Sequence, residues 1–467
     1  MSFTASLAEI IEKNANGLLG SRPTWRRVRL GEFCSILNGA PFPSERFSSI
    51  RGTPLIRIRD LVRGKTETFL DDTFDPAYMV HRSDLLVGMD GDFNCTLWAG
   101  EPGLLNQRVC KITPDERRAD RRFLTYVVPG YLSAINANTS AITVKHLSSR
   151  TLADLPLPLP SIDEQLRLVG YLDEQLSRLD ASVAALHRVQ ANLKRYRASV
   201  LKGSCEGRLV PTEAELARQE GRDFETGAQL LQRVLATRAT KWTARGDSAI
   251  ATAPDAKRLP ALPEGWTWAN AAQICGFITK GTTPSADKLT TAGDVQFLKV
   301  YNLTDDGVLN HAYKPAFISR ETHEGELARS MTMPGDVLMN IVGPPLGQVS
   351  VVPPGLTQAN INQAIARFRT VLPEMNRYLA QVLLTKDVLD RSLREAKTTV
   401  GQVNLTLQIC REIAIPLPPL AEQHRIVAEA DRRLSLIRAA EAQVTTNLAR
   451  AQRLRQSILR AAFSVPA

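Results

Sequence analysis

A chain of 467 residues is too long for one ordinary hydrophobic core, so we expect two to four domains. Its hydrophobic content of 43% and charged content of 23% are those of a soluble globular protein. No apolar run reaches the length of a transmembrane helix, which excludes a membrane-spanning chain. The formal net charge of +10 favours a polyanionic partner such as nucleic acid, although a basic protein without such a partner would have the same charge.

The cysteines and the N-terminal sequence exclude further classes of protein. The six cysteines are scattered, with no Cys-x-x-Cys pair and no nearby histidine pair, so neither a disulfide framework nor a zinc site is expected. The N-terminal sequence MSFTASLAEIIEKNANG is mixed polar and is not a signal peptide. We therefore expect a cytoplasmic protein with no bound metal and no contact with a membrane.

The first 157 residues are predicted to hold an N-terminal helical segment, residues 1–24, and an irregular α/β domain, residues 25–157. The sequence TPLIRIRDL, which begins at Thr53, alternates apolar and basic residues with period two and predicts a half-buried strand. SDLLVGM at 83–89 predicts a second strand, and a glycine-flanked loop follows it.

A long helix is predicted after Ser161. The alternating Leu-Pro run at 156–160 forces an extended segment, and Ser161 with Glu164 three residues later forms a capping box. Apolar residues then recur at two heptad positions, which favours a coiled-coil seam over a helix lying on a globular core. A helix of about 40 residues is a rod of roughly 60 Å. The seam residues of this helix are Leu172, Leu176, Leu179, Val183, Leu186 and Leu193.

The second half of the chain repeats the first. PLPSIDEQLRLV at 158–169 returns as PLPPLAEQHRIV at 416–427, and the match continues without a gap at an offset of 423 − 165 = 258. VQFLKVYNL at 295–303 corresponds to TPLIRIRDL, and PGDVLMNIVG at 334–343 corresponds to RSDLLVGMDG at 82–91. A repeat of this length indicates that one half of the protein was built twice. The second seam consists of Val427, Leu434, Ile437, Val444 and Ile458, with Glu441 and Arg455 at two further seam positions.

These observations predict a mixed α/β fold with a pseudo-twofold internal repeat. The connector between the halves should contain a short amphipathic helix, for which Thr226 and Gln229 are the start signal, and then a linker rich in Ala and Pro. The expected segments after the first domain are helix 158–210, connector 211–263, a second α/β domain 264–415 and a second helix 416–467.

No catalytic site is recognisable in the sequence. Asp75-Pro76-Ala77-Tyr78 is similar to the D-P-P-Y loop of amino-methyltransferases, but it lacks the second proline and a preceding glycine-rich cofactor loop, so a turn is the better interpretation. Gly64-Lys65-Thr66 matches the end of a phosphate-binding loop, but Arg59 stands where the first glycine is required. The chain is therefore predicted not to be an enzyme.

Side chains that could contact nucleic acid cluster at the repeated strand. Arginine and asparagine make bidentate contacts with guanine and adenine in the major groove, whereas solvated strand edges are the alternative interpretation. The candidates for DNA contact are Arg57, Arg59, Arg63 and Lys65 in the first half and Lys299, Tyr301 and Asn302 in the second.

The opening of the long helix, PLPxxxEQxRIV with Leu168 for the isoleucine in the first copy, occurs twice with a variable α/β domain before each copy. This arrangement resembles the specificity subunit of type I restriction–modification systems. Leu201-Lys202-Gly203 at the tail of the first helix and Leu262-Pro263-Glu264-Gly265-Trp266 before the second domain are further matches. The resemblance covers nearly the whole chain. Glu441 and Arg455, which interrupt the second seam, depart from the pattern.

This resemblance implies that each α/β domain is a target recognition domain for one half of an asymmetric, bipartite DNA site. It implies that the two helices pack antiparallel as a coiled-coil spacer between the half-sites. The implied partners are double-stranded DNA, two methyltransferase subunits that carry S-adenosylmethionine and methylate adenine, and possibly restriction subunits that use ATP and Mg to cleave DNA in phage defence. The chain itself would bind no cofactor.

Two other hypotheses make different predictions. A coiled-coil scaffold that binds only proteins would have no salt-dependent affinity for DNA, whereas domains that contact phosphates lose affinity steeply as salt rises. An enzyme with its own methyl transfer would bind the cofactor as an isolated chain.

Overall fold

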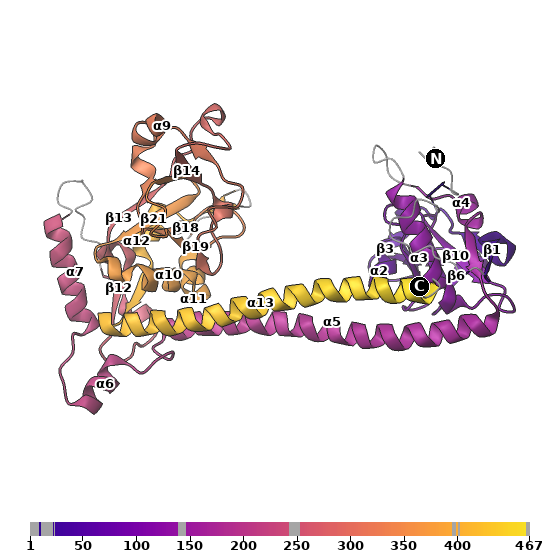
Figure 1. Ribbon diagram of the computed structural model, residues 1–467, viewed down its shortest axis with the longest axis horizontal. Coiled ribbons are helices and arrows are strands. Elements are labelled where there is room, and N and C mark those ends of the chain that lie inside the picture. The colour runs from indigo at the N-terminus through magenta and orange to yellow at the C-terminus, as the bar shows by residue number, and fades with distance from the viewer. Residues whose placement is uncertain are drawn as a thin grey trace. The chain divides into compact units, whose positions relative to one another are not determined.

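The computed structural model describes residues 9–10, 22, 24–138, 146–241, 253–394, 398–399 and 402–463. The chain divides into two compact units, of which unit 1 is Met1–His187 with Thr445–Ala467 and unit 2 is Arg188–Val444. Each unit combines one α/β domain with parts of the two long helices, α5 (Ile162–Cys205) and α13 (Leu420–Phe463) (Figure 1). The predicted class, mixed α/β with an internal repeat and long helices, is confirmed.

Two small sheets and a two-stranded ribbon form the α/β domain of unit 1, which we call domain 1. The first sheet has the order β2-β10-β7-β8 and is antiparallel throughout. The second has the order β3-β5-β4-β9-β6 and contains one parallel pair, β4 with β9. The ribbon pairs β1 with β11, which joins the start of the domain to the Leu-Pro run before α5. The strands are β1 (Arg26–Arg29), β2 (Cys34–Asn38), β3 (Phe47–Ser48), β4 (Thr53–Ile56), β5 (Phe69–Leu70), β6 (Met79–Val80), β7 (Leu85–Gly88), β8 (Cys95–Leu97), β9 (Gly103–Leu105), β10 (Val109–Pro114) and β11 (Pro156–Leu159).

Helix α3 (Arg121–Ala137) covers the first sheet of domain 1. It begins where the Asp120 side chain accepts a hydrogen bond from the backbone N–H of Phe123, an ordinary N-cap. Its apolar face, which includes Phe123 and Val127, is buried in the core of unit 1, where each buried side chain of this size contributes about 1.5–3 kcal/mol. The two short helices of the domain are α2 (Asp60–Arg63) and α4 (Ser149–Ala153).

The α/β domain of unit 2, domain 2, has the same plan. Its sheets have the orders β13-β21-β18-β19-β15 and β16-β14-β20-β17, its ribbon pairs β12 with β24, and β14 lies parallel to β20. The strands are β12 (Thr267–Asn270), β13 (Cys275–Lys280), β14 (Val295–Leu298), β15 (Gly307–Val308), β16 (Phe317–Ile318), β17 (Met331–Thr332), β18 (Val337–Asn340), β19 (Val349–Val351), β20 (Ala359–Ile361), β21 (Ile365–Thr370), β22 (Thr398–Thr399), β23 (Gln402–Val403) and β24 (Ala414–Leu417).

Strand positions confirm the repeat that the sequence predicts. Strand β14 begins 295 − 53 = 242 residues after β4, and β18 begins 337 − 85 = 252 residues after β7. Each strand occupies the same place in its sheet as its counterpart does, and β4 and β14 each have a parallel neighbour. The loops between the strands therefore changed length while the strand order was kept.

The remaining helices belong to the connector and to domain 2. The predicted connector helix is α7 (Gly227–Lys241). At its start the Thr226 hydroxyl accepts from the Gln229 backbone N–H, and the Gln229 side-chain oxygen Oε1 accepts from the Thr226 backbone N–H. The sequence did not predict α6 (Glu213–Glu220), which begins with a capping box between Thr212 and Glu215. Residues 242–252 of the predicted linker lie outside the described residues. The helices of domain 2 are α8 (Ala271–Ile274), α9 (Arg320–Glu324), α10 (Asn376–Leu384), α11 (Lys386–Arg394) and α12 (Leu407–Glu412).

The two long helices run antiparallel within each unit. In unit 1 the start of α5, with Leu172 and Leu176, shares a core with Phe463 at the end of α13. In unit 2 the end of α5, with Val200, shares a core with Leu434 near the start of α13. Of the predicted seam residues, Leu172, Leu176, Leu434, Ile437 and Val444 are buried, and Leu179, Val183, Leu186, Leu193, Val427 and Ile458 are half-buried.

The repeated Glu-Gln pair fastens the start of each long helix. The Gln165 side chain is fully buried, accepts a hydrogen bond from the Asp120 N–H at 2.9 Å, and donates to the carbonyls of Arg118 and Pro160. Gln423 is equally buried and donates to the Pro418 carbonyl at 2.9 Å. The motif that marks the repeat in the sequence therefore ties each helix to the chain before it.

Candidate nucleic-acid interface

In domain 1 the predicted DNA-contacting residues follow strand β4. The strand predicted over 53–61 ends at Ile56, because the Asp60 carboxylate accepts from the Arg57 N–H at 2.9 Å and turns the chain into α2. The Arg57 guanidinium lies over the Phe47 ring, 5.7 Å from its centroid. The strand prediction beyond Ile56 was therefore wrong, and the arginines lie on a turn.

The other three basic residues of domain 1 are exposed. The Arg59 side chain is 56% exposed and donates to the Thr68 hydroxyl at 3.1 Å. Arg63 ends helix α2, and Lys65 follows Gly64, whose φ of 65° is a left-handed conformation that suits glycine. The Lys65 ammonium lies 3.8 Å from the Glu67 carboxylate. These exposed cationic side chains lie on the turn after β4, at the end of α2 and just beyond it, and their contact with DNA stays a prediction.

Domain 2 has the same turn after strand β14. Asn302 is 2% exposed, and its side-chain oxygen accepts from the Lys299 N–H at 2.8 Å, as Asp60 does from Arg57. Its amide nitrogen donates to the carbonyls of Asn310 and Tyr313. Because its donors and its acceptor are engaged, Asn302 shapes the turn, and the predicted contact with a base would require these bonds to break. The half-buried Lys299 and the exposed Tyr301 remain candidates for DNA contact.

Sequence reasoning missed two residues beside Tyr301. Tyr313 packs edge-on against it, with ring centroids 5.9 Å apart, and the Tyr301 hydroxyl donates to the Lys314 carbonyl at 3.1 Å. The Lys314 ammonium lies 5.3 Å from the centroid of the Tyr313 ring. Tyr301 and Tyr313 are 40% and 48% exposed, so this cluster presents aromatic surface and positive charge together. The partners lie in the connection between β14 and β16, which is longer than the corresponding connection between β4 and β5 in domain 1, so no repeated pattern signals them.

The two turns present different chemistry at equivalent positions. Since 301 − 59 equals the strand offset of 242, Tyr301 occupies in domain 2 the position of Arg59 in domain 1. Buried Asp60 and Asn302 close both turns in the same way. The same backbone turn therefore presents the cationic side chain of Arg59 in domain 1 and the phenol of Tyr301 in domain 2.

The methyltransferase-like segment noted in the sequence has a structural role. The Asp75 carboxylate accepts from the Ala77 N–H at 2.9 Å, so the Asp-Pro-Ala-Tyr segment is a turn. Within the described residues, no group of three or more His, Cys, Asp or Glu side chains is arranged to hold a metal ion. No helix in the same part of the chain has the length and apolarity to cross a membrane.

Comparison with known proteins decides the family. Residues 23–192 and 263–435 match the sequence model of the type I restriction modification DNA specificity domain. The chain belongs to this family. As a specificity subunit, it is a DNA-sequence-recognition component of a type I restriction–modification system and not the catalytic one. Each matched segment contains one of the two α/β domains and the start of one long helix.

Two curated relatives of this specificity subunit match it over most of their own length. It is 36% identical over 470 residues to the type I restriction enzyme EcoBI specificity subunit of Escherichia coli, covering 99% of this chain and 90% of the relative. It is 21% identical over 442 residues to the EcoKI specificity subunit of E. coli strain K12, covering 88% and 81%. A chain solved in work on complex assembly and conformational transition of the type I R-M system has the same fold, with a TM-score of 0.59, 21% identity, and coverage of 95% and 98%.

Proposed function

We propose that each α/β domain reads one half of a two-part DNA site and that the two long helices connect the two readers. The observation that carries this proposal is the shared turn that presents Arg59 in domain 1 and Tyr301 in domain 2. An arginine fork bonds bidentately to guanine or to phosphate, whereas a tyrosine offers a hydroxyl and a stacking face. Because the two chemistries differ, the two half-sites would differ, and the whole site would be asymmetric.

The partners follow from the family and from the repeat. Two methyltransferase subunits would dock, one on each half of the chain, because the repeated helices offer two related surfaces. These partners would carry S-adenosylmethionine and methylate adenine, and restriction subunits that use ATP and Mg would add cleavage. The cofactors belong to the partners in this proposal. The six cysteines, all free thiols and all but Cys95 buried, accord with a reducing cytoplasm.

Sequencing of methylated DNA tests the proposal. The chain and its methyltransferase are expressed in a host that lacks adenine methylation, and methylated positions are mapped across the genome. Wild type should produce one motif with two specified halves and an unspecified gap. Arg59→Ala should relax one half and Tyr301→Ala the other, since losing a good base contact costs about 1–3 kcal/mol of discrimination. Arg51→Ala is the control, because Arg51 is 81% exposed and pairs with Asp71 on the same domain.

Two results would contradict the proposal. A contiguous motif would remove the two-reader account, and so would variants of both domains that relax the same half. A complex with no salt-dependent affinity for DNA would instead support the scaffold hypothesis.

A further inference from the structure

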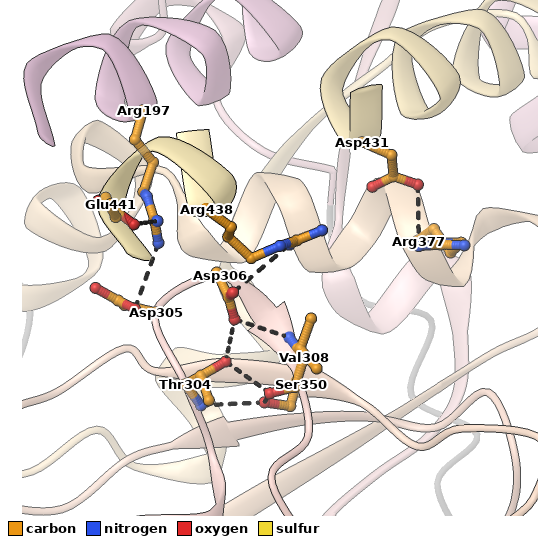
Figure 2. Close-up of polar contacts among 10 residues, drawn as sticks. All are labelled: Arg197, Thr304, Asp305, Asp306, Val308, Ser350, Arg377, Asp431, Arg438 and Glu441. Carbon is orange, nitrogen blue, oxygen red and sulfur yellow. Dashed lines mark hydrogen bonds and ion pairs between the residues drawn. The ribbon is translucent and has the colours of Figure 1, made fainter. Parts of the chain in front are cut away.

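In each unit, an arginine at the start of a domain helix forms an ion pair with an aspartate of a long helix. Arg122 is the second residue of α3 and pairs with Asp173 of α5. Arg377 is the second residue of α10, and its Nη2 lies 2.9 Å from Oδ2 of Asp431 of α13 (Figure 2). The two aspartates differ by 431 − 173 = 258, which is the offset of the helix repeat. The pair is therefore part of the duplicated frame, although the domains around it diverged.

The contacts around the two pairs differ. Four residues after Arg122, the Tyr126 hydroxyl donates to Asp173. Gln381 holds the corresponding position after Arg377, is 5% exposed, and neither atom of its amide has a partner among the described residues. The Arg–Asp pair is thus a polar contact that the two junctions share.

Domain 2 is held by a second set of ion pairs. Asp306 lies 3.5 Å from Arg438 of α13, and Asp305 lies 3.5 Å from Arg197 of α5. The Asp306 carboxylate also accepts from the Thr304 hydroxyl and the Val308 N–H, which fixes the loop that carries both aspartates (Figure 2). These ion pairs add to the apolar packing at the junction of unit 2, where Leu379 of α10 and Leu434 of α13 belong to one buried core.

Each junction also contains a pocket beside its buried core. The pocket of unit 1 is about 600 Å³ and is lined by Tyr126 and Leu176 among others. The pocket of unit 2 is about 450 Å³ and is lined by Gln381 and Leu434, and 434 − 176 again equals 258. At the open edge of such a pocket, a directional polar contact adds geometric specificity to the packing of two elements.

We propose that Arg122–Asp173 and Arg377–Asp431 are positioning pairs, which fix the angle of each recognition domain on its long helix and so the gap permitted between half-sites. This inference rests on the proposed function. The arginine side chains are 56% and 67% exposed, and ion pairs so exposed add little to stability. The occurrence of such a pair in both units is explained by its geometry instead, because a planar guanidinium restricts how the carboxylate partner is oriented.

The first arm of the test measures the angle without DNA. Spin labels are placed in the full chain at Ala312→Cys in domain 2 and Leu436→Cys in α13, both exposed positions, with half-buried Cys95 replaced by Ser. Double electron–electron resonance then gives the distribution of distances between the two spin labels. Arg377→Glu should broaden the distribution, and Arg377→Glu with Asp431→Arg should narrow it again. Lys288→Glu is the control, because it breaks a surface pair with Glu326 inside domain 2.

The second arm measures the gap. The complex with the methyltransferase is given DNA in which the two half-sites are one base pair closer or farther apart than in the natural site. Arg377→Glu should reduce the preference for the natural gap about fivefold, the upper range for an exposed ion pair, and the charge-swapped variant should restore it. A general loss of folding would lower methylation at every gap alike and leave this ratio unchanged.

The two arms separate the inference from the proposed function. If wild type methylates no two-part site, the proposed function fails, and the label distances still decide whether the pair sets the angle. A label distribution as narrow in Arg377→Glu as in wild type would overturn the inference, as would a charge swap that restores neither the distribution nor the gap preference.

Discussion

Arg197 of α5 and Glu441 of α13 face each other across the two long helices, with Nη2 of the arginine 2.6 Å from Oε2 of the glutamate. The sequence places Glu441 at a seam position, where a carboxylate interrupts the apolar stripe. The structure gives this interruption a partner. Arg455, the other interruption, lies 258 residues after Arg197 and pairs with Asp180 of α5 at 2.7 Å. Both interruptions therefore hold the two helices together by charge.

The two interhelical pairs should differ in their effect on stability. The Arg197 and Glu441 side chains are 13% and 30% exposed, so Glu441→Ala leaves a largely buried guanidinium with Asp305 at 3.5 Å. We expect the free energy of unfolding to fall by roughly 1–3 kcal/mol. Asp180→Ala is the matched variant in the exposed pair and should change it by less than about 1 kcal/mol. Urea unfolding of both variants measures the two changes in stability. Equal changes would contradict a larger contribution from the more buried pair.

The repeated glutamine should be more important in the first copy than in the second. Gln165→Leu leaves the Asp120 N–H and the carbonyls of Arg118 and Pro160 without their side-chain partner. Each buried group that loses its hydrogen-bond partner costs about 1–3 kcal/mol, so we expect the free energy of unfolding to fall by at least about 2 kcal/mol. Gln423→Leu removes the bond to Pro418 and should cost less. Calorimetric unfolding measures the stability of both variants. A larger loss of stability for Gln423→Leu than for Gln165→Leu would refute the greater importance of the first copy.

Gln381 should be a position where an apolar side chain is better tolerated than the natural one. Its amide is buried with no partner among the described residues. Gln381→Met keeps the shape and removes the unsatisfied groups, so we expect the free energy of unfolding to rise by about 1 kcal/mol. The same substitution at Gln165 is the control and should lower it. Destabilisation by Gln381→Met would show that the amide is used.

Alkaline pH should destabilise the fold through its buried thiols. Burial raises the pKa of Cys34, Cys205 and Cys410 to about 12 from an ordinary value of 9.0. Above pH 9 the unfolded chain therefore releases protons that the folded chain keeps, and stability falls as pH rises from 9 towards 12. Urea unfolding at pH 8 and pH 10.5 checks this, with Cys410→Ala expected to show a smaller loss between the two. An unchanged pH dependence in this variant would contradict the role of the thiol.

Elements with a local or repeated signal could be predicted from the sequence. The Leu-Pro runs, the repeated Glu-Gln pairs and the 258-residue offset all lie on contiguous segments. They appear in the structure as strands, as helix starts tied to the preceding chain and as matched helices. The strands after Thr53 and Val295 were placed correctly at their starts and extended too far, because a period-two pattern does not show that Asp60 and Asn302 turn the chain.

Contacts between distant segments could not be predicted in this way. Asp173 and Asp431 are visibly identical in the repeat, but their arginine partners lie 173 − 122 = 51 and 431 − 377 = 54 residues earlier, in domains that diverged. Tyr313 and Lys314 join Tyr301 through a connection that is longer than its counterpart in domain 1. Neither arrangement follows from periodicity, because tertiary pairing of side chains depends on how the sheets bring loops together.

A chain that carries domain 1 twice tests the central claim, that each domain reads one half-site, most directly. The segment Thr267–Leu417 is replaced by Arg26–Leu159, which exchanges the domains at equivalent ribbon strands, β12–β24 for β1–β11. With the methyltransferase present, genome-wide methylation mapping should reveal a symmetric two-part site, in which the half read by domain 1 occurs twice as an inverted repeat. The natural asymmetric motif, produced by this chain in a folded complex, would contradict the claim.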